Sequence, residues 1–200
     1  SIRQPLLETL AAINPKTIAI NFSKNDVHAD GLGHGLFQVL TGYLNGTPFS
    51  DSLLSAESIA GALRSRKTAG EIELMKTSIL ETEKIYADTF AYLQPGMTER
   101  QVADYMLEKV ERAGFQTAWE RAHCPAINAG PESPVGHSGP TTLKLARGQI
   151  IHFDFGVKIN GYCSDIQRVV YLSGNDEKQV PEPVRVGFET IQNAVQAAAA

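Results

Sequence analysis

The sequence predicts an α+β fold in two parts, because three kinds of pattern follow one another along the chain. Short strand and helix patterns alternate up to residue 66, two longer helical patterns follow, and apolar β-type runs with Gly/Pro loops begin at Trp119. We place the boundary near Arg66-Lys67. Residues 1–66 are expected to belong to a small α/β domain, and residues 67–200 to a larger α+β domain.

The elements of the first part have local signals. Residues 17–22 (TIAINF) are apolar and partly β-branched, as in a buried strand. Residues 23–35 are rich in Asn, Asp and Gly, which predicts a loop. Apolar residues at helical spacing then predict a helix over 36–44, ended by an Asn-Gly pair, and a second short helix over 55–64.

Capping signals begin both helices of the middle part. Thr68 is followed three residues later by Glu71, and Thr98 by Gln101, which is the spacing of a capping box. The first helix is predicted to run to about Leu93, and the second to end at Gly114. The apolar stripe of the first helix comprises Ile72, Met75, Ile79, Tyr86, Phe90 and Leu93. A structural role accounts for both helices.

The last part is predicted to contain an antiparallel hairpin. Strand patterns cover 149–157 and 162–172, and the Asn160-Gly161 pair between them is a strong signal for a tight turn. The preceding segment, 126–140, contains three glycines and three prolines, which predicts a shaped loop. A final helix is predicted to begin near Pro183.

Two aspartates of this hairpin are predicted to share one face of the sheet. With a two-residue turn, Asp154 lies opposite Gln167 and diagonal to Asp165; with a four-residue turn, the two aspartates lie opposite each other. Carboxylates placed in this way repel each other unless a cation or a proton lies between them. The pair is therefore a candidate site for one or two divalent metal ions, and oxygen ligands favour Mn²⁺, Co²⁺ or Zn²⁺ over copper. The alternative is one solvated aspartate and one that caps a turn.

The composition argues against nucleic acid or a membrane as partner. The formal net charge is −4, and no basic run is present. No apolar stretch approaches the roughly 20 residues that span a bilayer, and the first residues lack a secretory signal. Two cysteines are too few for a disulfide framework. We expect a cytoplasmic protein.

Residues 125–174 resemble the metal-binding half of the pita-bread metallopeptidases, which include methionine aminopeptidase, prolidase and aminopeptidase P. The matching segments are AINAGPESPVGH and HFDFGVKINGYCSDIQRVV. In that family an Asp-x-Gly on one strand precedes a Gly-Tyr-x-x-Asp-x-x-Arg on the next, and residues 154–156 and 161–168 match both. Residues 29–35 are similar to the later part of the N-terminal domain of prolidase and aminopeptidase P. Residues 63–79 are similar to the segment that joins that domain to the catalytic domain. Both similarities favour the proline-directed branch.

The resemblance implies a fold, a reaction and a ligand set. Residues 1–66 would form the C-terminal part of a creatinase-like N-terminal domain, and residues 67–200 the N-terminal half of a pita-bread domain. Asp154 and Asp165 would hold two divalent metal ions, expected to be manganese with cobalt or zinc as alternatives. A metal-bridged hydroxide would hydrolyse a bond near the N-terminus of a small peptide, expected to be Xaa-Pro. His137 would act on the substrate as a catalytic residue rather than a ligand, and the protein would be a homodimer.

Other histidines are weaker candidates. His123 precedes the Gly/Pro loop and His152 alternates with Asp154, so each is a candidate to line the site or bind substrate. A structural role is the alternative for both, and for His137 the alternative is a brace for its own loop.

The chain does not supply every ligand that the resemblance implies. The family's remaining ligands, a histidine and two glutamates, lie downstream of the second aspartate. The chain ends 35 residues after Asp165. The glutamates in this last stretch are Glu177, Glu182 and Glu189, and it contains no histidine. We expect a fragment of a longer enzyme that is inactive alone; a truncated, inactive protein is the alternative. A creatinase-like amidine hydrolase or a non-catalytic binding module on the same fold is the alternative function.

Overall fold

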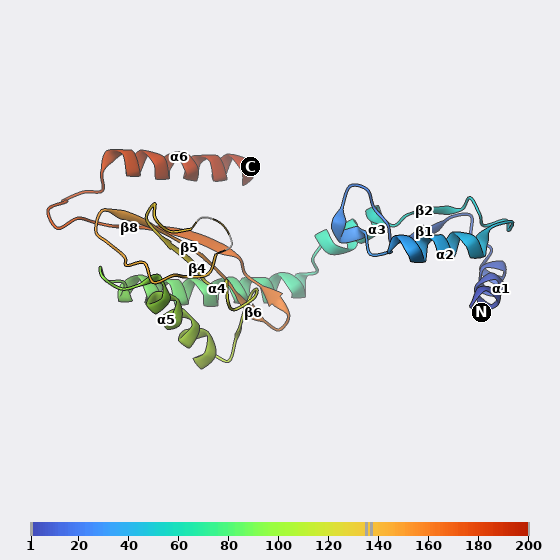
Figure 1. Cartoon of the computed structure of the whole chain (residues 1–200), viewed down its shortest axis with the longest axis horizontal. Helices are drawn as coiled ribbons and strands as arrows, with labels where there is room; N and C mark the ends of the chain where they lie inside the picture. The colour runs from blue at the N-terminus through green and yellow to red at the C-terminus, as the bar shows by residue number, and fades with distance from the viewer. Residues whose placement is uncertain (1, 135, 137, 200) are drawn as a thin grey trace. The chain divides into compact units, whose positions relative to one another are not determined.

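The structure is a computed structural model that describes residues 2–134, 136 and 138–199. The chain divides into two compact units, Ser1–Thr68 and Ala69–Ala200, and each is described by itself (Figure 1).

The first unit is built around a parallel pair of strands. Its elements are α1 (Arg3–Ile13), β1 (Ile18–Ile20), the 3₁₀ helix η1 (Val27–Ala29), α2 (His34–Leu44), β2 (Leu53–Ser55) and α3 (Glu57–Ser65). Strand β1 pairs with β2, with Ile18 opposite Leu53. The predicted strand and both predicted helices are confirmed. Helix α1 and strand β2 are not among the predicted elements. Because β2 ends at Ser55, helix α3 begins at Glu57 rather than at residue 55.

The second unit combines helices with two small antiparallel sheets. Its elements are α4 (Ala69–Tyr92), α5 (Glu99–Arg112), β3 (Gln116–Thr117), β4 (Ala126–Ala129), β5 (Gln149–Phe155), β6 (Val157–Ile159), β7 (Tyr162–Cys163), β8 (Ile166–Leu172) and α6 (Glu182–Ala199). The strand orders are β3-β6-β7 and β4-β5-β8. The predicted loop over 126–140 is wrong at its start, because residues 126–129 pair with β5 as strand β4.

The hairpin has the register of a two-residue turn. Ile159 lies opposite Tyr162, and further along the strands Asp154 lies opposite Gln167. Asn160 and Gly161 both have positive φ, at 50° and 88°, as the predicted tight turn requires. The four-residue alternative is therefore excluded.

The two strands of the hairpin change sheets at Gly156. A Cβ atom at this position would lie 1.9 Å from the carbonyl oxygen of Ser164. Immediately beyond, the backbone N–H of Val157 donates to Ser164 Oγ at 3.0 Å, and this hydroxyl also hydrogen-bonds Thr82 of α4 at 2.7 Å. The glycine of the Asp-x-Gly motif thus permits the close approach that precedes Asp165.

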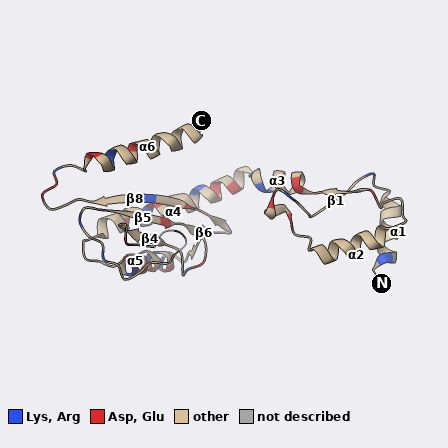
Figure 2. Ribbon diagram, turned by 45° about the horizontal axis from the view of Figure 1, so that its top comes forward, with Lys and Arg blue, Asp and Glu red and all other residues tan. Residues whose placement is uncertain are grey.

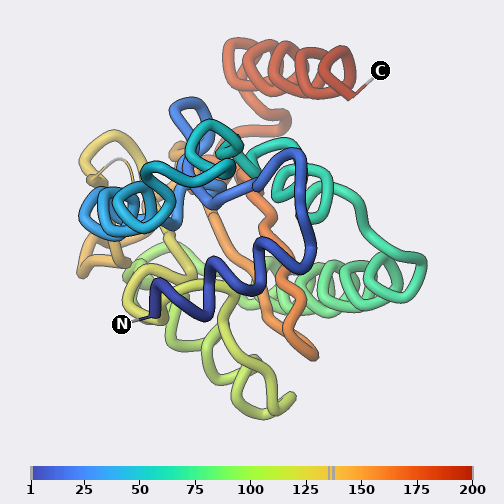
Figure 3. The backbone as a smooth tube through the Cα atoms, turned by 90° about the vertical axis from the view of Figure 1, so that its right-hand side faces the viewer, coloured from blue at the N-terminus to red at the C-terminus, as the bar shows by residue number. Residues whose placement is uncertain are grey.

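Helix α4 lies beside the hairpin (Figure 1 and Figure 3). Three of its buried residues, Ser78, Thr82 and Thr89, carry hydroxyl groups. Ser78 Oγ donates to the carbonyl of Tyr162 at 2.9 Å, and Tyr86 OH donates to the carbonyl of Ile166 at 2.7 Å. The predicted apolar stripe is wrong in part, because Ile72 and Ile79 are 42% and 41% exposed. Hydroxyl groups of α4 therefore bind the strands on this face, and Ile85 adds a buried apolar side chain to the core.

The hydrophobic core lies between α4, α5 and the sheet β4-β5-β8. Phe153 and Phe155 are fully buried on one face of β5, and the Tyr86 ring packs edge-on against both, with centroid distances of 6.2 and 5.7 Å. Met106 of α5 closes the same cluster. Since neighbouring strand residues point to opposite faces, burial of residues 153 and 155 sends the side chain of Asp154 to the other face.

The N-terminus of α5 has the predicted capping box. Thr98 Oγ1 accepts from the backbone N–H of Gln101 at 3.1 Å, and the Gln101 side chain accepts from the N–H of Thr98 at 2.9 Å. The helix ends just before Gly114, whose φ is +71°. Both predicted limits of this helix are confirmed.

The helices carry mixed charge. Acidic and basic residues are interspersed along α4 and α6 (Figure 2). Within the described part of the chain, no helix combines the length and apolar character needed to cross a bilayer.

The Gly156→Ala variant of the protein that carries this chain is expected to lose about 1–3 kcal/mol of unfolding free energy, because its methyl group meets a backbone carbonyl rather than a flexible side chain. Urea unfolding measures the loss. Gly70→Ala is the matched control: nothing lies within 4 Å of a Cβ at Gly70, in α4, so this change is expected to be neutral or slightly stabilising. Equal midpoints for Gly156→Ala and the unchanged protein would contradict the proposed close approach.

Candidate metal centre

Asp154 is held in place by β5, on the face opposite the core. Its neighbours Phe153 and Phe155 are fully buried, so the backbone at this position is fixed from both sides. Asp154 itself is half-buried, and its Oδ1 atom is shielded from solvent with no hydrogen-bond partner among the described residues. An orphaned carboxylate oxygen is costly, because a buried polar atom without a partner loses its hydration without compensation.

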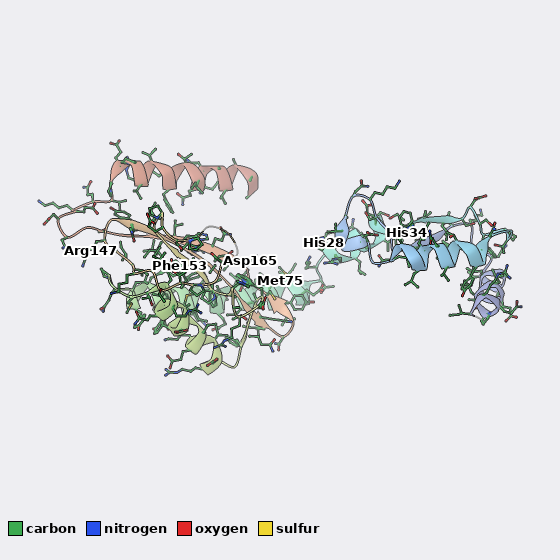
Figure 4. The ribbon with its side chains drawn as sticks, in the orientation of Figure 1. His28, His34, Met75, Arg147, Phe153 and Asp165 are labelled. Atoms are coloured by element: carbon green, nitrogen blue, oxygen red, sulfur yellow. The ribbon has the colours of Figure 1, made fainter. Side chains whose placement is uncertain are left out.

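Asp165 lies where β7 ends and β8 begins, and it is exposed (Figure 4). The pKa of Asp154 is raised above its ordinary value, first by burial and then by the negative charge of Asp165. The two aspartates therefore come together on one face of the hairpin, as their spacing predicts. Their mutual repulsion is the electrostatic feature that a bound cation would relieve.

No lysine or arginine of the hairpin neutralises this pair. Arg168 follows on β8 but lies opposite Phe153, on the core-facing side of the strand. There it forms an ion pair with Glu83 of α4. Arg168 therefore points away from the aspartates.

A row of polar side chains runs from Asp154 across the sheet. Gln167, opposite Asp154, donates from Nε2 to Asp154 Oδ2 at 3.4 Å. Its Oε1 lies 3.4 Å from Nε2 of His152, and His152 Nδ1 lies 3.2 Å from Oδ1 of Asn128 on β4. His152 thus lies on the same face as the aspartates and contacts Asp154 only through Gln167.

Asn128 also fastens the start of the Gly/Pro loop to this face. Its amide donates to the carbonyl of Pro134 at 2.9 Å and to Ser133 Oγ at 3.3 Å. Further along the loop, a Cβ at Gly139 would lie 2.4 Å from the carbonyl oxygen of Ala122, so the loop returns to the segment before β4. His137, the predicted catalytic residue, lies outside the described residues.

His123 has a different environment from the aspartates. Its side chain is 43% exposed, and Nδ1 lies 3.6 Å from a carboxylate oxygen of Glu120. Its backbone carbonyl accepts from the indole of Trp119 at 2.9 Å. The position borders the loop at Gly139 but gives His123 no described contact with Asp154 or Asp165.

The donor set fits part of a site for a hard divalent cation. Two carboxylates converge, one of them with an unpartnered buried oxygen, and such oxygens are what these cations prefer. Among the described residues no group of three or more His, Cys, Asp or Glu side chains is arranged to hold a metal. Asp154 and Asp165 are the described residues whose carboxylate oxygens fit such a site.

Sequence reasoning did not single out Gln167 or Asn128 as site residues. The signal for Gln167 was available, since the predicted register already placed it opposite Asp154. Asn128 lies in the segment for which the sequence predicts a Gly/Pro loop. Its pairing with His152 on the neighbouring strand therefore has no sequence signal.

The chain is similar to curated peptidases. The chain is 28% identical over 175 residues to the Xaa-Pro dipeptidase of Lactobacillus helveticus, covering 86% of this chain and 45% of that protein. It spans less than half the length of the curated relatives it matches.

Solved structures show the same fold. The X-Pro aminopeptidase of Thermotoga maritima superposes with a TM-score of 0.62 at 22% identity, over 92% of this chain and 47% of that one. The prolidase of Pyrococcus horikoshii superposes with a TM-score of 0.61 at 20% identity, over 90% and 46% of the two chains. The predicted fold, the end of a small α/β domain followed by the first half of a pita-bread domain, is thereby confirmed.

The family assignment rests on the second unit, which contains both aspartates. The profile of metallopeptidase family M24 matches residues 73–200, from early in α4 to the end of the chain. This chain belongs to metallopeptidase family M24.

Proposed function

We propose that the protein carrying this chain hydrolyses a peptide bond next to the N-terminus of a small peptide, with divalent metal ions as cofactors. The observation that carries the proposal is the convergence of Asp154 and Asp165 on one sheet face, with Asp154 Oδ1 buried and unpartnered. Membership of a metallopeptidase family supports this reading of the pair.

Asp154 and Asp165 are the residues of this chain that would hold the metal. When bound, such ions lower the pKa of water and draw charge from the scissile carbonyl. Gln167 orients the Asp154 carboxylate by donating to Oδ2, which leaves Oδ1 available to bind a metal ion. His137 is proposed to hydrogen-bond the substrate carbonyl during hydrolysis, a role suited to a side chain that titrates near neutrality.

The proposed substrate has proline after the bond that is cleaved. Support comes from the relatives, which are named Xaa-Pro dipeptidase, X-Pro aminopeptidase and prolidase. Manganese is the proposed metal, and a homodimer the proposed assembly. Both cysteines are free, which suits a reducing compartment, so we propose a cytoplasmic location.

Hydrolysis of an Xaa-Pro dipeptide and of a longer Xaa-Pro peptide, with and without Mn²⁺ or Co²⁺, tests the function. Metal-dependent cleavage of either peptide is expected in the whole protein that carries this chain, and the preferred length distinguishes dipeptidase from aminopeptidase. Bound metal without cleavage would indicate another substrate class, such as an amidine. Absence of both would favour a binding module and contradict the proposal.

Asp154→Asn and Asp165→Asn are each expected to abolish metal-dependent hydrolysis and to lower the bound metal measured by elemental analysis. An amide oxygen carries no charge, so it holds a divalent cation much less strongly than a carboxylate. The fold should persist, because neither side chain belongs to the hydrophobic core. Asp104→Asn, at an exposed position on α5, is the matched control and should retain metal and activity. Full metal content in the Asp154 and Asp165 variants would refute the ligand assignment.

The metal-free protein is expected to become more stable when Asp154 is replaced by Asn, in a pH-dependent way. The pKa of Asp154 is raised in the folded state, so the ionised side chain destabilises the fold at neutral pH, and protonation removes this penalty. The difference in melting temperature between Asp154→Asn and the unchanged protein should therefore shrink as the pH falls toward the ordinary Asp value of 3.8. Thermal unfolding in EDTA across this range measures it, and a difference that stays constant would contradict the repulsion.

A further inference from the structure

Glu99 is a buried carboxylate that has no part in the proposed metal centre. It occupies the first turn of α5, directly after the capping residue Thr98, where a glutamate is ordinarily solvated. Here the residue is 0% exposed. Burial of a carboxylate is unfavourable unless several donors replace its water, so the position calls for a specific set of partners.

The partners of Glu99 are the two ends of the Gly/Pro loop. Its Oε1 accepts from the backbone N–H of Ala129, the last residue of β4, at 2.7 Å. Its Oε2 accepts from the backbone N–H of Thr141 at 2.8 Å and from the Thr141 hydroxyl at 2.6 Å. One carboxylate therefore joins the residue before the loop to the residue after it.

The backbone around Glu99 strengthens one of these attachments. The N–H of Arg100 donates to the carbonyl of Thr141 at 3.0 Å, and the N–H of Glu99 donates to the carbonyl of Leu143 at 3.0 Å. The far end of the loop is thus fixed to the start of α5 by main-chain bonds. The near end, at Ala129, is linked to the same point through the Glu99 side chain.

The loop between these ends reaches the face that carries Asp154. Asn128 holds Pro134 of the loop and also contacts His152, which is connected through Gln167 to Asp154. A change in the separation of the loop's ends would therefore alter where the loop lies along this polar row. Of the described residues between 130 and 140, Ser133 and Pro140 are buried, so the fixed ends are an important restraint on the loop's path.

We propose that Glu99 is a positioning residue for hydrolysis, which joins Ala129 and Thr141 and thereby fixes both ends of the loop relative to the metal-binding face. The inference rests on the proposed function, because the loop contains His137, the proposed catalytic residue. A carboxylate is needed because both oxygens accept. A glutamine would turn its NH₂ group toward either Ala129 or Thr141. Two donors would then face each other, because each of these residues already presents a backbone N–H there.

The first measurement is independent of activity. In the Glu99→Gln variant, amide hydrogen exchange at Ala129 and Thr141 is expected to become faster, because each N–H loses or shares its acceptor. Glu108→Gln is the matched control, since Glu108 is an exposed glutamate of the same helix that forms an ion pair with Arg112. Its exchange pattern should match that of the unchanged protein. Unchanged exchange at Ala129 and Thr141 in Glu99→Gln would overturn the proposal.

The second measurement separates positioning from a general effect on stability. With Mn²⁺ and an Xaa-Pro peptide, Glu99→Gln is expected to lower kcat by about 10²-fold, as misplacement of a catalytic group does, with metal content unchanged. In a His137→Ala background the same change should have almost no further effect, because residues that act as a unit are not additive. Additive losses, or loss of bound metal, would overturn the positioning role.

A milder pair of variants covers the case in which Glu99→Gln does not fold. Thr141→Val removes the hydroxyl that Oε2 accepts from, whereas Thr141→Ser keeps it. Lower kcat and faster Ala129 exchange in Thr141→Val, with recovery in Thr141→Ser, support the proposal; equal behaviour of the two variants overturns it. If the unchanged protein hydrolyses no Xaa-Pro peptide, the proposed function fails, and the exchange data still decide whether Glu99 joins the loop's ends.

Discussion

The register between β5 and β8 determines where every polar group of the metal centre lies. Asp154 faces Gln167 because the turn at Asn160-Gly161 has two residues. The close contact between Gly156 and Ser164 maintains the register where the strands change sheets. A slip by one residue would turn one strand's side chains to the opposite face. The aspartates would then be separated by the sheet, and no pair of carboxylates would exist to bind a cation.

The same register imposes an electrostatic cost that the metal-free fold has to bear. Burial and the charge of Asp165 both raise the pKa of Asp154, and its Oδ1 has no partner among the described groups. The surroundings provide the stability that offsets this cost. Phe153 and Phe155 pack under Tyr86, while Ser78 and Thr82 bind the neighbouring strand from α4. Sites that are strained in this way are typical of functional centres, since a ligand relieves the strain.

Two buried polar arrangements show where pattern-based reasoning is weakest. The sequence of α4 indicates an apolar stripe that includes Ile79, yet Ser78 and Thr82 contact the strands, because their hydroxyl groups hydrogen-bond backbone atoms of the hairpin. Glu99 has the sequence setting of a solvated first-turn residue, yet it accepts three hydrogen bonds in the interior. In both cases the donors or acceptors come from segments at least 30 residues away.

The sequence by itself determined the order of the elements, the hairpin turn, the shared face of Asp154 and Asp165, and the family resemblance. These features depend on local chemistry: turn residues, capping boxes, and the alternation of side chains along strands. Only the tertiary structure decided that β4 pairs with β5, that Asn128 and Gln167 connect His152 to Asp154, and that Glu99 joins the ends of a loop. Those contacts depend on which distant segments pack together, and no local pattern encodes that choice.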